Sequence, residues 1–265
     1  MISKLRLFGA ACAAAVALAI ATPADAQNAL DRILKEKKIR ITAEVTAPPF
    51  GILGADGQPD GSEIATARQL AKDLGVELEL VQVTGPNRIP ALLSGRADVA
   101  ISSLSITLDR AKVVMFANPH GALSIVVTGP ANVGIKSPAD LAGKRIGITR
   151  ATLEEATVPK VSPQGTNIVF FDDMAATIQA LISGQVDAAG MSAFGAKSIR
   201  DRNPGRNLED KITVTTAYYA AAVKPGDHEL LRWINTWVFI NKQNGVLAQI
   251  YEKYTGVKLV DLPVF

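Results

Sequence analysis

After the first 26 residues, segments whose apolar positions have strand-like spacing alternate with segments whose apolar positions have helical spacing. Apolar, β-branched positions at residues 39–43 predict a strand, and residues 76–83 alternate in a strand-like way. Between them, apolar positions over residues 63–74 recur with helical spacing and end at Gly75, a typical helix stop. Such alternation predicts α/β units whose mostly parallel sheets are flanked by helices.

One short pattern occurs twice. Residues 91–100 read ALLSGRADVA, and residues 180–189 read ALISGQVDAA. In the first copy, a helix at residues 89–93 stops at Gly95 and a short strand follows at residues 99–101. Because open α/β sheets bind ligands at the carboxyl ends of their strands, the repeat suggests two similar lobes facing a crevice. The pattern is also a common helix-to-strand connection, so by itself it leaves a single sheet open.

The first 26 residues have the features of a secretory signal peptide. A charged start precedes an almost unbroken apolar stretch at residues 7–20, and Ala24-Asp25-Ala26 is a small-x-small cleavage site. An uncleaved anchor is the alternative, but the stretch is shorter than the ~20 residues that span a bilayer. Lipid attachment at Cys12 is disfavoured because no bulky apolar residue stands just before it. We therefore expect export to the periplasm, with cleavage near Ala26.

Composition narrows the function classes. Lys and Arg number 28 against 25 Asp and Glu, with no long block of one sign, so no nucleic-acid partner is expected. A single Cys and two His exclude a disulfide scaffold and a zinc finger. His120 and His228 lie far apart in the sequence, and we expect neither a metal site nor a cofactor. A ligand contact by His120 stays open.

An ordered set of motifs runs through the chain. It comprises Pro48-Pro49-Phe50, Asp56-Gly57 followed by Gly61, the serine segment at residues 102–107 with Arg110 three residues on, Phe116, and the segments 137–144 and 244–256. Together these motifs resemble the solute-binding proteins of polar amino-acid ABC transporters (family 3), which include the histidine and lysine/arginine/ornithine binding proteins. The resemblance covers essentially the whole chain after the predicted signal peptide.

The resemblance implies a type II periplasmic-binding-protein fold, in which two α/β lobes are joined by a two-strand hinge. In that family the chain forms the first lobe, then the second, and then returns to the first. We expect the signal peptide at residues 1–26, lobe I at 27–121, lobe II at 122–217 and the return to lobe I at 218–265. The two crossings are expected near residues 121–124 and 216–219.

Hydroxyl groups and one guanidinium follow the strand expected at residues 99–101. Ser102, Ser103 and Ser105 offer donors and acceptors beside backbone N–H groups, and Arg110 supplies a planar fork suited to a carboxylate. Alone, a serine run is more typical of a simple turn and an arginine of a solvated surface. The family spacing reverses that interpretation, so Arg110 is expected to bind the ligand carboxylate, with the serines assisting.

The second expected contact region follows a strand at residues 145–148, where the family has a Gly- and Thr-rich turn opening a helix. Thr149 and Thr152 are expected at the ligand, and Thr152 is also a natural helix N-cap. Glu155 completes a capping box with Thr152 and should turn back onto its own helix. Glu154 matches a ligand-contacting position, and both a pocket and a surface location stay open.

Two departures from the family pattern bear on the ligand. The aspartate that binds the α-ammonium group in the family corresponds to Ser192, and a hydroxyl does not replace an ionic partner. Glu44, at the end of the first strand, is the first candidate to replace it and Glu154 the second. The family's ligand-flanking aromatic positions hold Ala47 and Gly85, which disfavours large aromatic or guanidinium ligands.

The resemblance implies a non-catalytic, monomeric receptor that closes over a small amino acid or related carboxylate and presents it to the membrane permease of an ABC importer. The alternative is an exported enzyme of the same fold, resembling the cyclohexadienyl dehydratases. That reaction needs a protonatable acid beside the leaving hydroxyl. Residues 192–195 supply none, although Glu44 and Glu154 remain conceivable acids. A sensor input domain is disfavoured because no membrane helix and signalling domain follow.

Overall fold

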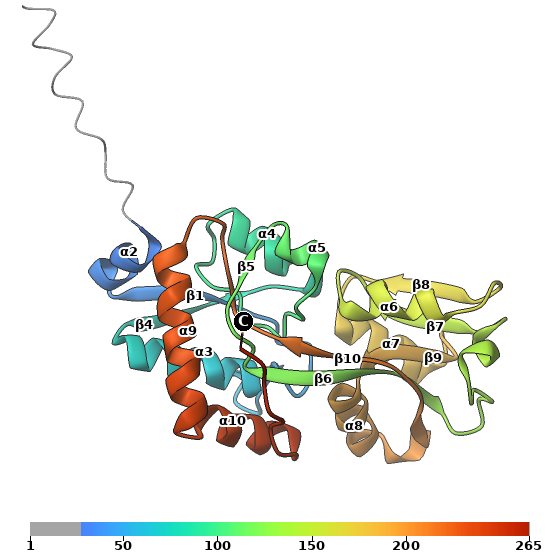
Figure 1. The fold of residues 1–265 in the computed structure, drawn as a ribbon. Helices are drawn as coiled ribbons and strands as arrows, with labels where there is room; N and C mark the ends of the chain where they lie inside the picture. The colour runs from blue at the N-terminus through green and yellow to red at the C-terminus, as the bar shows by residue number, and fades with distance from the viewer. Residues whose placement is uncertain (1–27, 265) are drawn as a thin grey trace, which may run out of the picture.

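The computed structural model describes residues 28–264, so the predicted signal peptide lies outside the described residues. Two α/β lobes lie side by side and are joined by two long strands, β6 (Gly121–Pro130) and β10 (Leu208–Tyr219) (Figure 1). This arrangement agrees with the predicted two-lobe fold. Within residues 28–264, the helices are too short or too polar to cross a membrane.

Lobe I contains the N-terminal part of the described chain and its C-terminal helices (Figure 1). Its strands are β1 (Lys38–Ala43), β2 (Ile52–Leu53), β3 (Pro59–Asp60), β4 (Glu77–Gln82), β5 (Met115–Phe116) and β11 (Ala222–Val223). Its helices are α2 (Ala29–Glu36), α3 (Ser62–Leu74), the 3₁₀ turn η2 (Gly85–Asn87), α4 (Arg88–Leu93), α5 (Leu108–Ala111), α9 (His228–Gln243) and α10 (Val246–Thr255). The core packs β1 against α3 and α9 through Ile39, Ile41, Leu70 and Trp237.

The strand expected at residues 99–101 is only partly formed. Val99 makes one parallel bridge to Ile41 of β1, and Ala100 makes one antiparallel bridge to Ala222 of β11. The segment therefore lies between two strands without forming a continuous ladder with either. It leads directly into the serine segment, where Ser103 adopts a left-handed backbone with a φ of 47°.

Lobe II is built on one five-stranded sheet with the order β10-β6-β9-β7-β8. Strand β7 (Arg145–Thr149) runs parallel to both β8 (Asn167–Phe171) and β9 (Ala188–Ser192), whereas β6 is antiparallel to β9 and β10. The helices of this lobe are η3 (Pro138–Leu141), α6 (Leu153–Val161), α7 (Met174–Ser183), α8 (Ala193–Arg202) and η4 (Pro204–Arg206). The mostly parallel sheet that was expected is thus extended by the two antiparallel connecting strands.

The repeated sequence pattern forms the same local structure in both lobes. Asp98 accepts hydrogen bonds from the backbone N–H of Arg40 at 2.8 Å and from its Nη2 at 2.7 Å. Asp187 accepts from the backbone N–H and the Nη2 of Arg145, both at 2.7 Å. Each aspartate therefore links the end of its pattern to a neighbouring parallel strand. The two lobes share this local structure, as the repeat predicted.

The hinge strands pair closely where they leave lobe I. Gly121 is paired with Tyr219 and Ser124 with Thr216 in the β6–β10 ladder. A Cβ atom at Gly121 would lie 2.1 Å from the ring of Tyr219, so only glycine allows this close approach. The lobe boundaries at residues 121/122 and 217/218 fall within this paired segment and stay predictions.

Candidate functional site

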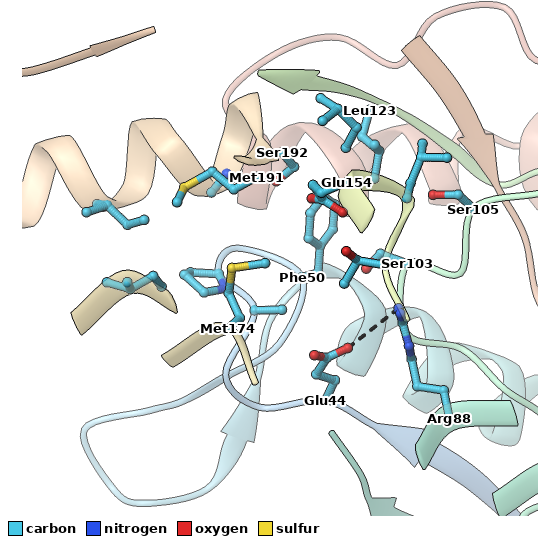
Figure 2. A pocket seen from close by; sticks show the side chains of 18 of the residues that line it. Glu44, Phe50, Arg88, Ser103, Ser105, Leu123, Glu154, Met174, Met191 and Ser192 are labelled. Carbon is cyan, nitrogen blue, oxygen red and sulfur yellow. Dashed lines mark hydrogen bonds and ion pairs between the residues drawn. The ribbon is translucent and has the colours of Figure 1, made fainter. Parts of the chain in front are cut away.

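A pocket lies between the lobes, where the chain leaves the carboxyl ends of β1, β7 and β9. Its cavity volume is about 50 Å³. Figure 2 shows its polar and apolar sides, with the Glu44–Arg88 pair at the bottom and Met174 and Met191 on the left. The lining residues are Glu44, Ala47, Pro48, Phe50, Arg88, Ser103, Ser105, Arg110, Leu123, Ile125, Thr152, Leu153, Glu154, Met174, Ile178, Met191, Ser192, Gly195 and Ile199.

Arg110 reaches this pocket from the short helix α5. Thr107 caps that helix by accepting the backbone N–H of Arg110 at 3.2 Å. The guanidinium donates from Nη1 to the backbone carbonyl of Ser105 and from Nη2 to that of Ala151, both at 2.8 Å. Burial and the neighbouring Arg88 lower the pKa of Arg110 to about 10, so the side chain remains a cation at neutral pH.

A second arginine, Arg88, is buried beside it. Its Nε donates to the carbonyl of Gly85 at 3.0 Å, Nη1 to that of Ser102 at 3.1 Å and Nη2 to that of Ala151 at 3.0 Å. Nη1 also lies 3.6 Å from Oε2 of Glu44. Sequence reasoning missed Arg88 because it belongs to none of the recognised motifs. The only local signal was Gly85, where the absence of an aromatic ring leaves space for the guanidinium.

Both arginines of lobe I meet lobe II at a single backbone carbonyl, that of Ala151. Ala151 has a φ of 56°, a left-handed conformation that is uncommon for a residue with a side chain. Its amide N–H donates to the Glu155 carboxylate at 2.5 Å. The two lobes are thus joined across the pocket by charge-assisted hydrogen bonds from lobe I.

Glu44 and Glu154 are both buried in the pocket. Burial raises the pKa of Glu44, although the nearby Arg88 opposes that shift. Burial also raises the pKa of Glu154, while its hydrogen bonds with its own backbone N–H and the Thr152 hydroxyl act in the opposite direction. The structure therefore places Glu154 in the pocket rather than on the surface.

Seven of the nine site residues chosen from the sequence line this pocket. They are Glu44, Ser103, Ser105, Arg110, Thr152, Glu154 and Ser192. The remaining two lie behind its wall, where the hydroxyl of Ser102 is 3.2 Å from that of Thr42 and the hydroxyl of Thr149 is 2.7 Å from that of Thr177. The side chains of Ser102 and Thr149 therefore have protein partners, and their contact with a ligand stays a prediction.

Ser103 is held in place by a buried pair outside the pocket lining. Its backbone N–H donates to Oε2 of Glu63 at 2.8 Å, and the other carboxylate oxygen of Glu63 lies 3.1 Å from Nε2 of His120. His120 thus faces Glu63 and packs edge-on against Tyr219 at the start of the hinge. The structure gives His120 a supporting place beneath the serine segment instead of a place among the lining residues.

The N-terminus of α6 agrees with the capping prediction in one part and differs in another. Thr152 caps the helix by accepting the backbone N–H of Glu155 at 3.3 Å. The Glu155 carboxylate turns back as expected, but it accepts the N–H of Ala151 rather than that of Thr152. The left-handed conformation of Ala151 brings its amide into reach, so the return bond closes one residue earlier than in a standard capping box.

The apolar wall of the pocket was not anticipated. It consists of Leu123, Ile125, Met174, Ile178, Met191 and Ile199, which come from β6, α7, β9 and α8. In the sequence these positions look like ordinary core residues of a strand or helix, and several of them also belong to the lobe II core. No group of three or more His, Cys, Asp or Glu side chains within residues 28–264 is arranged to hold a metal ion.

Comparison with known proteins gives a consistent set of relatives. The family model for bacterial extracellular solute-binding proteins, family 3, matches residues 39–257. The L-cystine-binding protein TcyJ of Escherichia coli (strain K12) is 29% identical over 239 residues, which cover 87% of each chain.

Solved structures agree with this match. The solute receptor for L-cysteine of Neisseria gonorrhoeae has a TM-score of 0.80 at 29% identity, covering 85% of this chain and 92% of its own. The ancestral amino acid-binding protein AncCDT-1, a precursor of cyclohexadienyl dehydratase, has a TM-score of 0.78 at 30% identity and covers 85% of this chain and 99% of its own.

Proposed function

The chain belongs to the bacterial extracellular solute-binding proteins, family 3, and on this premise we propose that it binds a small amino acid or a related carboxylate. The receptor acts as a monomer in the periplasm, after removal of the signal peptide near Ala26. It closes its two lobes over the ligand and presents the closed form to the permease of an ABC importer. The relatives named for L-cystine and L-cysteine support an amino acid as the ligand.

The half-buried guanidinium of Arg110 in the pocket between the lobes carries this proposal. A cation partly withdrawn from water needs an anionic or hydrogen-bonding partner, and two of its N–H groups already bond to backbone carbonyls. The remaining donors, together with the hydroxyls of Ser103 and Ser105, can bind a ligand carboxylate. Thr152 and Ser192 complete the polar contacts from lobe II.

Closure follows from the position of these groups on both lobes. A ligand that contacts Arg110 in lobe I and Thr152 in lobe II interacts with the closed form more strongly than with the open one. Ligand binding therefore shifts the population toward the closed form. The bonds from the two arginines to Ala151 support the same closed arrangement.

The enzymatic alternative receives less support. Dehydration and decarboxylation of a prephenate-type acid require a proton donor beside the leaving hydroxyl. Ser192 and its neighbours on α8 supply none, which leaves the buried carboxyl groups of Glu44 and Glu154, and the nearby arginines oppose the rise in pKa that burial causes in both. A non-catalytic receptor is therefore the function that we propose.

A thermal-shift screen of the mature protein tests this function. The twenty amino acids, several organic acids and prephenate are added separately, and at least one amino acid should raise the melting temperature. A ligand at 100 times its Kd stabilises the folded state by about 2.7 kcal/mol. If no amino acid or carboxylate shifts the transition, or if prephenate is consumed catalytically, the receptor proposal is wrong.

A further inference from the structure

Four charged side chains line the pocket, two of each sign. Arg88 and Arg110 come from lobe I together with Glu44, and Glu154 comes from lobe II. The pocket is therefore balanced before any ligand arrives. A zwitterion of net charge zero preserves this balance, whereas a net cation or a simple carboxylate leaves one buried charge without a partner. Leaving a buried charge unpaired is costly.

Glu44 already has its partners. Arg88 lies 3.6 Å from its Oε2, and a hydrogen bond from the backbone of Gly85 also favours its charged form. Arg88 in turn is held by three backbone carbonyls, so the pair is fixed on the lobe I side of the pocket. The first sequence candidate for an ammonium partner is thus already in use.

Glu154 differs from Glu44 in this respect. It forms no ion pair with any of the residues 28–264, and its own backbone N–H, Thr152 and the more distant charges of Arg88 and Arg110 only partly oppose the effect of its burial. It is nevertheless buried and faces the pocket (Figure 2). A carboxylate in this situation has acceptor capacity left for a cationic group of a ligand.

Gly190 brings Glu154 next to Ser192. A Cβ atom at Gly190 would lie 3.5 Å from the Cβ of Glu154 and 3.7 Å from its Cγ, so Glu154 packs over the bare backbone of β9. Residues two apart on a strand share one face, and Gly190 and Ser192 are such a pair. Glu154 therefore covers the same face of β9 on which the Ser192 side chain stands.

The far side of the pocket contains no charge. Met174, Ile178, Met191 and Ile199 form it, all from lobe II, and the four charged residues are the only ones among the lining residues of the described chain. Thioether side chains are flexible and polarisable, so they adapt to ligand groups of different shapes. A ligand guanidinium or ammonium in this region would have no carboxylate partner among the lining residues.

We propose that Glu154 binds the α-ammonium group of the ligand and that the apolar wall of lobe II receives an uncharged aliphatic or sulfur-containing side chain. The ligand class is then the zwitterionic amino acids with neutral, apolar side chains. This inference rests on the proposed receptor function. A carboxylate on helix α6 thereby takes the place of the one that β9 does not supply at Ser192.

Isothermal titration calorimetry with the mature protein tests the ligand class directly. The probes are L-methionine, L-leucine, L-cysteine, L-arginine, L-glutamate and 4-(methylsulfanyl)butanoate, which is L-methionine without its ammonium group. At least one of the three neutral amino acids should bind at least tenfold more tightly than L-arginine and L-glutamate. L-methionine should likewise bind at least tenfold more tightly than its deaminated analogue.

Variants test the role of Glu154. Glu154→Gln keeps the shape of the side chain, and it should weaken L-methionine at least tenfold while leaving the deaminated analogue within about twofold. Glu229→Gln is the matched control, because it changes an exposed carboxylate in the first turn of a helix, α9, away from the pocket. The double variant Glu154→Gln/Ser192→Asp should regain most of the lost affinity for L-methionine. Circular dichroism checks the fold of each variant.

The outcomes separate this inference from the receptor proposal. If amino acids bind but L-arginine or L-glutamate binds as tightly as the neutral ones, the assigned ligand class is wrong and the receptor function stands. If Glu154→Gln binds L-methionine like the wild type, Glu154 is not the ammonium partner. If Glu154→Gln fails to fold, the comparison of L-methionine with its deaminated analogue on the wild type still decides. Failure of every amino acid to bind the wild type overturns this inference, and the receptor proposal falls with it if no other carboxylate binds.

Discussion

Lobe I and lobe II contain the same aspartate motif but anchor it differently. In lobe I, Asp98 is 3% exposed and contacts the guanidinium groups of both Arg32 and Arg40. In lobe II, Asp187 is 28% exposed and contacts that of Arg145 alone among the described residues. The extra partner comes from helix α2, which packs beside β1 at the outer end of lobe I (Figure 1). The same sequence pattern therefore gives the same local geometry in both lobes, but the aspartate of lobe I is more buried and has one more arginine partner.

The same contrast appears inside the pocket. Lobe I contributes both arginines and the Glu44 carboxylate, all held by backbone carbonyls or by each other. Lobe II contributes the apolar wall, Glu154 and the carbonyl of Ala151. We infer that lobe I fixes the charged end of a ligand and that lobe II selects its side chain as the lobes close.

Removing the Arg110 side chain of lobe I should have the largest effect on ligand binding. Truncation of one partner in a buried charge pair costs about 2–5 kcal/mol, so Arg110→Ala should weaken carboxylate binding roughly 30-fold or more. The control is Lys112→Ala, which removes an exposed cation two residues further along the chain. Calorimetry measures both variants. Affinity near that of the wild type, with an unchanged circular dichroism spectrum, would contradict the assignment of Arg110 as the group that binds the ligand carboxylate.

The two aspartate motifs can be compared by stability. Asp98→Ala leaves two guanidinium groups without their buried partner and should lower the free energy of unfolding by about 3 kcal/mol. Asp187→Ala removes a partly exposed pair and should lower it by about 1 kcal/mol or less. Urea unfolding of the ligand-free protein gives both values. Equal losses would mean that the additional arginine and the deeper burial of Asp98 add nothing.

An aromatic contact between the lobes offers a third comparison. Phe194 of lobe II packs edge-on against Phe50 at 6.2 Å and Tyr251 at 5.8 Å between ring centres, and both partners belong to lobe I. Because aromatic pairs of this kind contribute about 0.5–1.5 kcal/mol each, Phe194→Ala should weaken the closed form and lower ligand affinity about fivefold. Phe170→Ala, on the outer strand of lobe II, is the control.

Small-angle scattering completes this test. With saturating ligand, the wild type should have a smaller radius of gyration than without ligand, and Phe194→Ala should need more ligand to reach the same value. A variant that closes at the ligand concentration of the wild type would show that the aromatic contact does not stabilise closure.

The smallest expected effect is on pH dependence. Burial raises the pKa of Glu154 above its ordinary value of 4.5, and an ammonium ligand requires the charged form. Binding should therefore weaken as the pH falls toward the raised pKa of Glu154, with proton release on binding in that range. Glu154→Gln should lose this dependence while Glu44→Gln keeps it. Calorimetry in two buffers of different ionisation enthalpy measures the released protons.

The charge state of Glu154 affects the free energy of unfolding with a pH dependence opposite to that of ligand binding. Because the pKa of Glu154 is higher in the folded state than in the unfolded chain, the folded state binds more protons between the two values. The contribution of this group to the free energy of unfolding is therefore present below the unfolded pKa and is lost as the pH rises through the folded pKa. Urea unfolding at several pH values, with Glu154→Gln as reference, isolates it.

Local sequence determined much of this protein. Helical spacing and a following glycine correctly predicted α3 and its end at Gly75, and Thr152 forms the expected N-cap of α6. The repeated Ser-Gly-x-x-Asp pattern predicted two related lobes. In the structure both copies bond to a neighbouring strand in the same way. The helix end and the N-cap depend on neighbours within a few residues, so the sequence determines them directly, whereas the aspartate bonds join residues 58 and 42 positions apart.

Tertiary structure decided the chemistry of the pocket. Arg88 faces Glu44 because β1 and α4 pack together, and Glu154 turns inward where α6 packs over Gly190 of β9. Likewise, the hydroxyls of Ser102 and Thr149 find partners in Thr42 and Thr177 and lie behind the pocket wall. Burial and charge pairing depend on which distant segments meet, so residues of the same type can line the pocket or lie behind its wall.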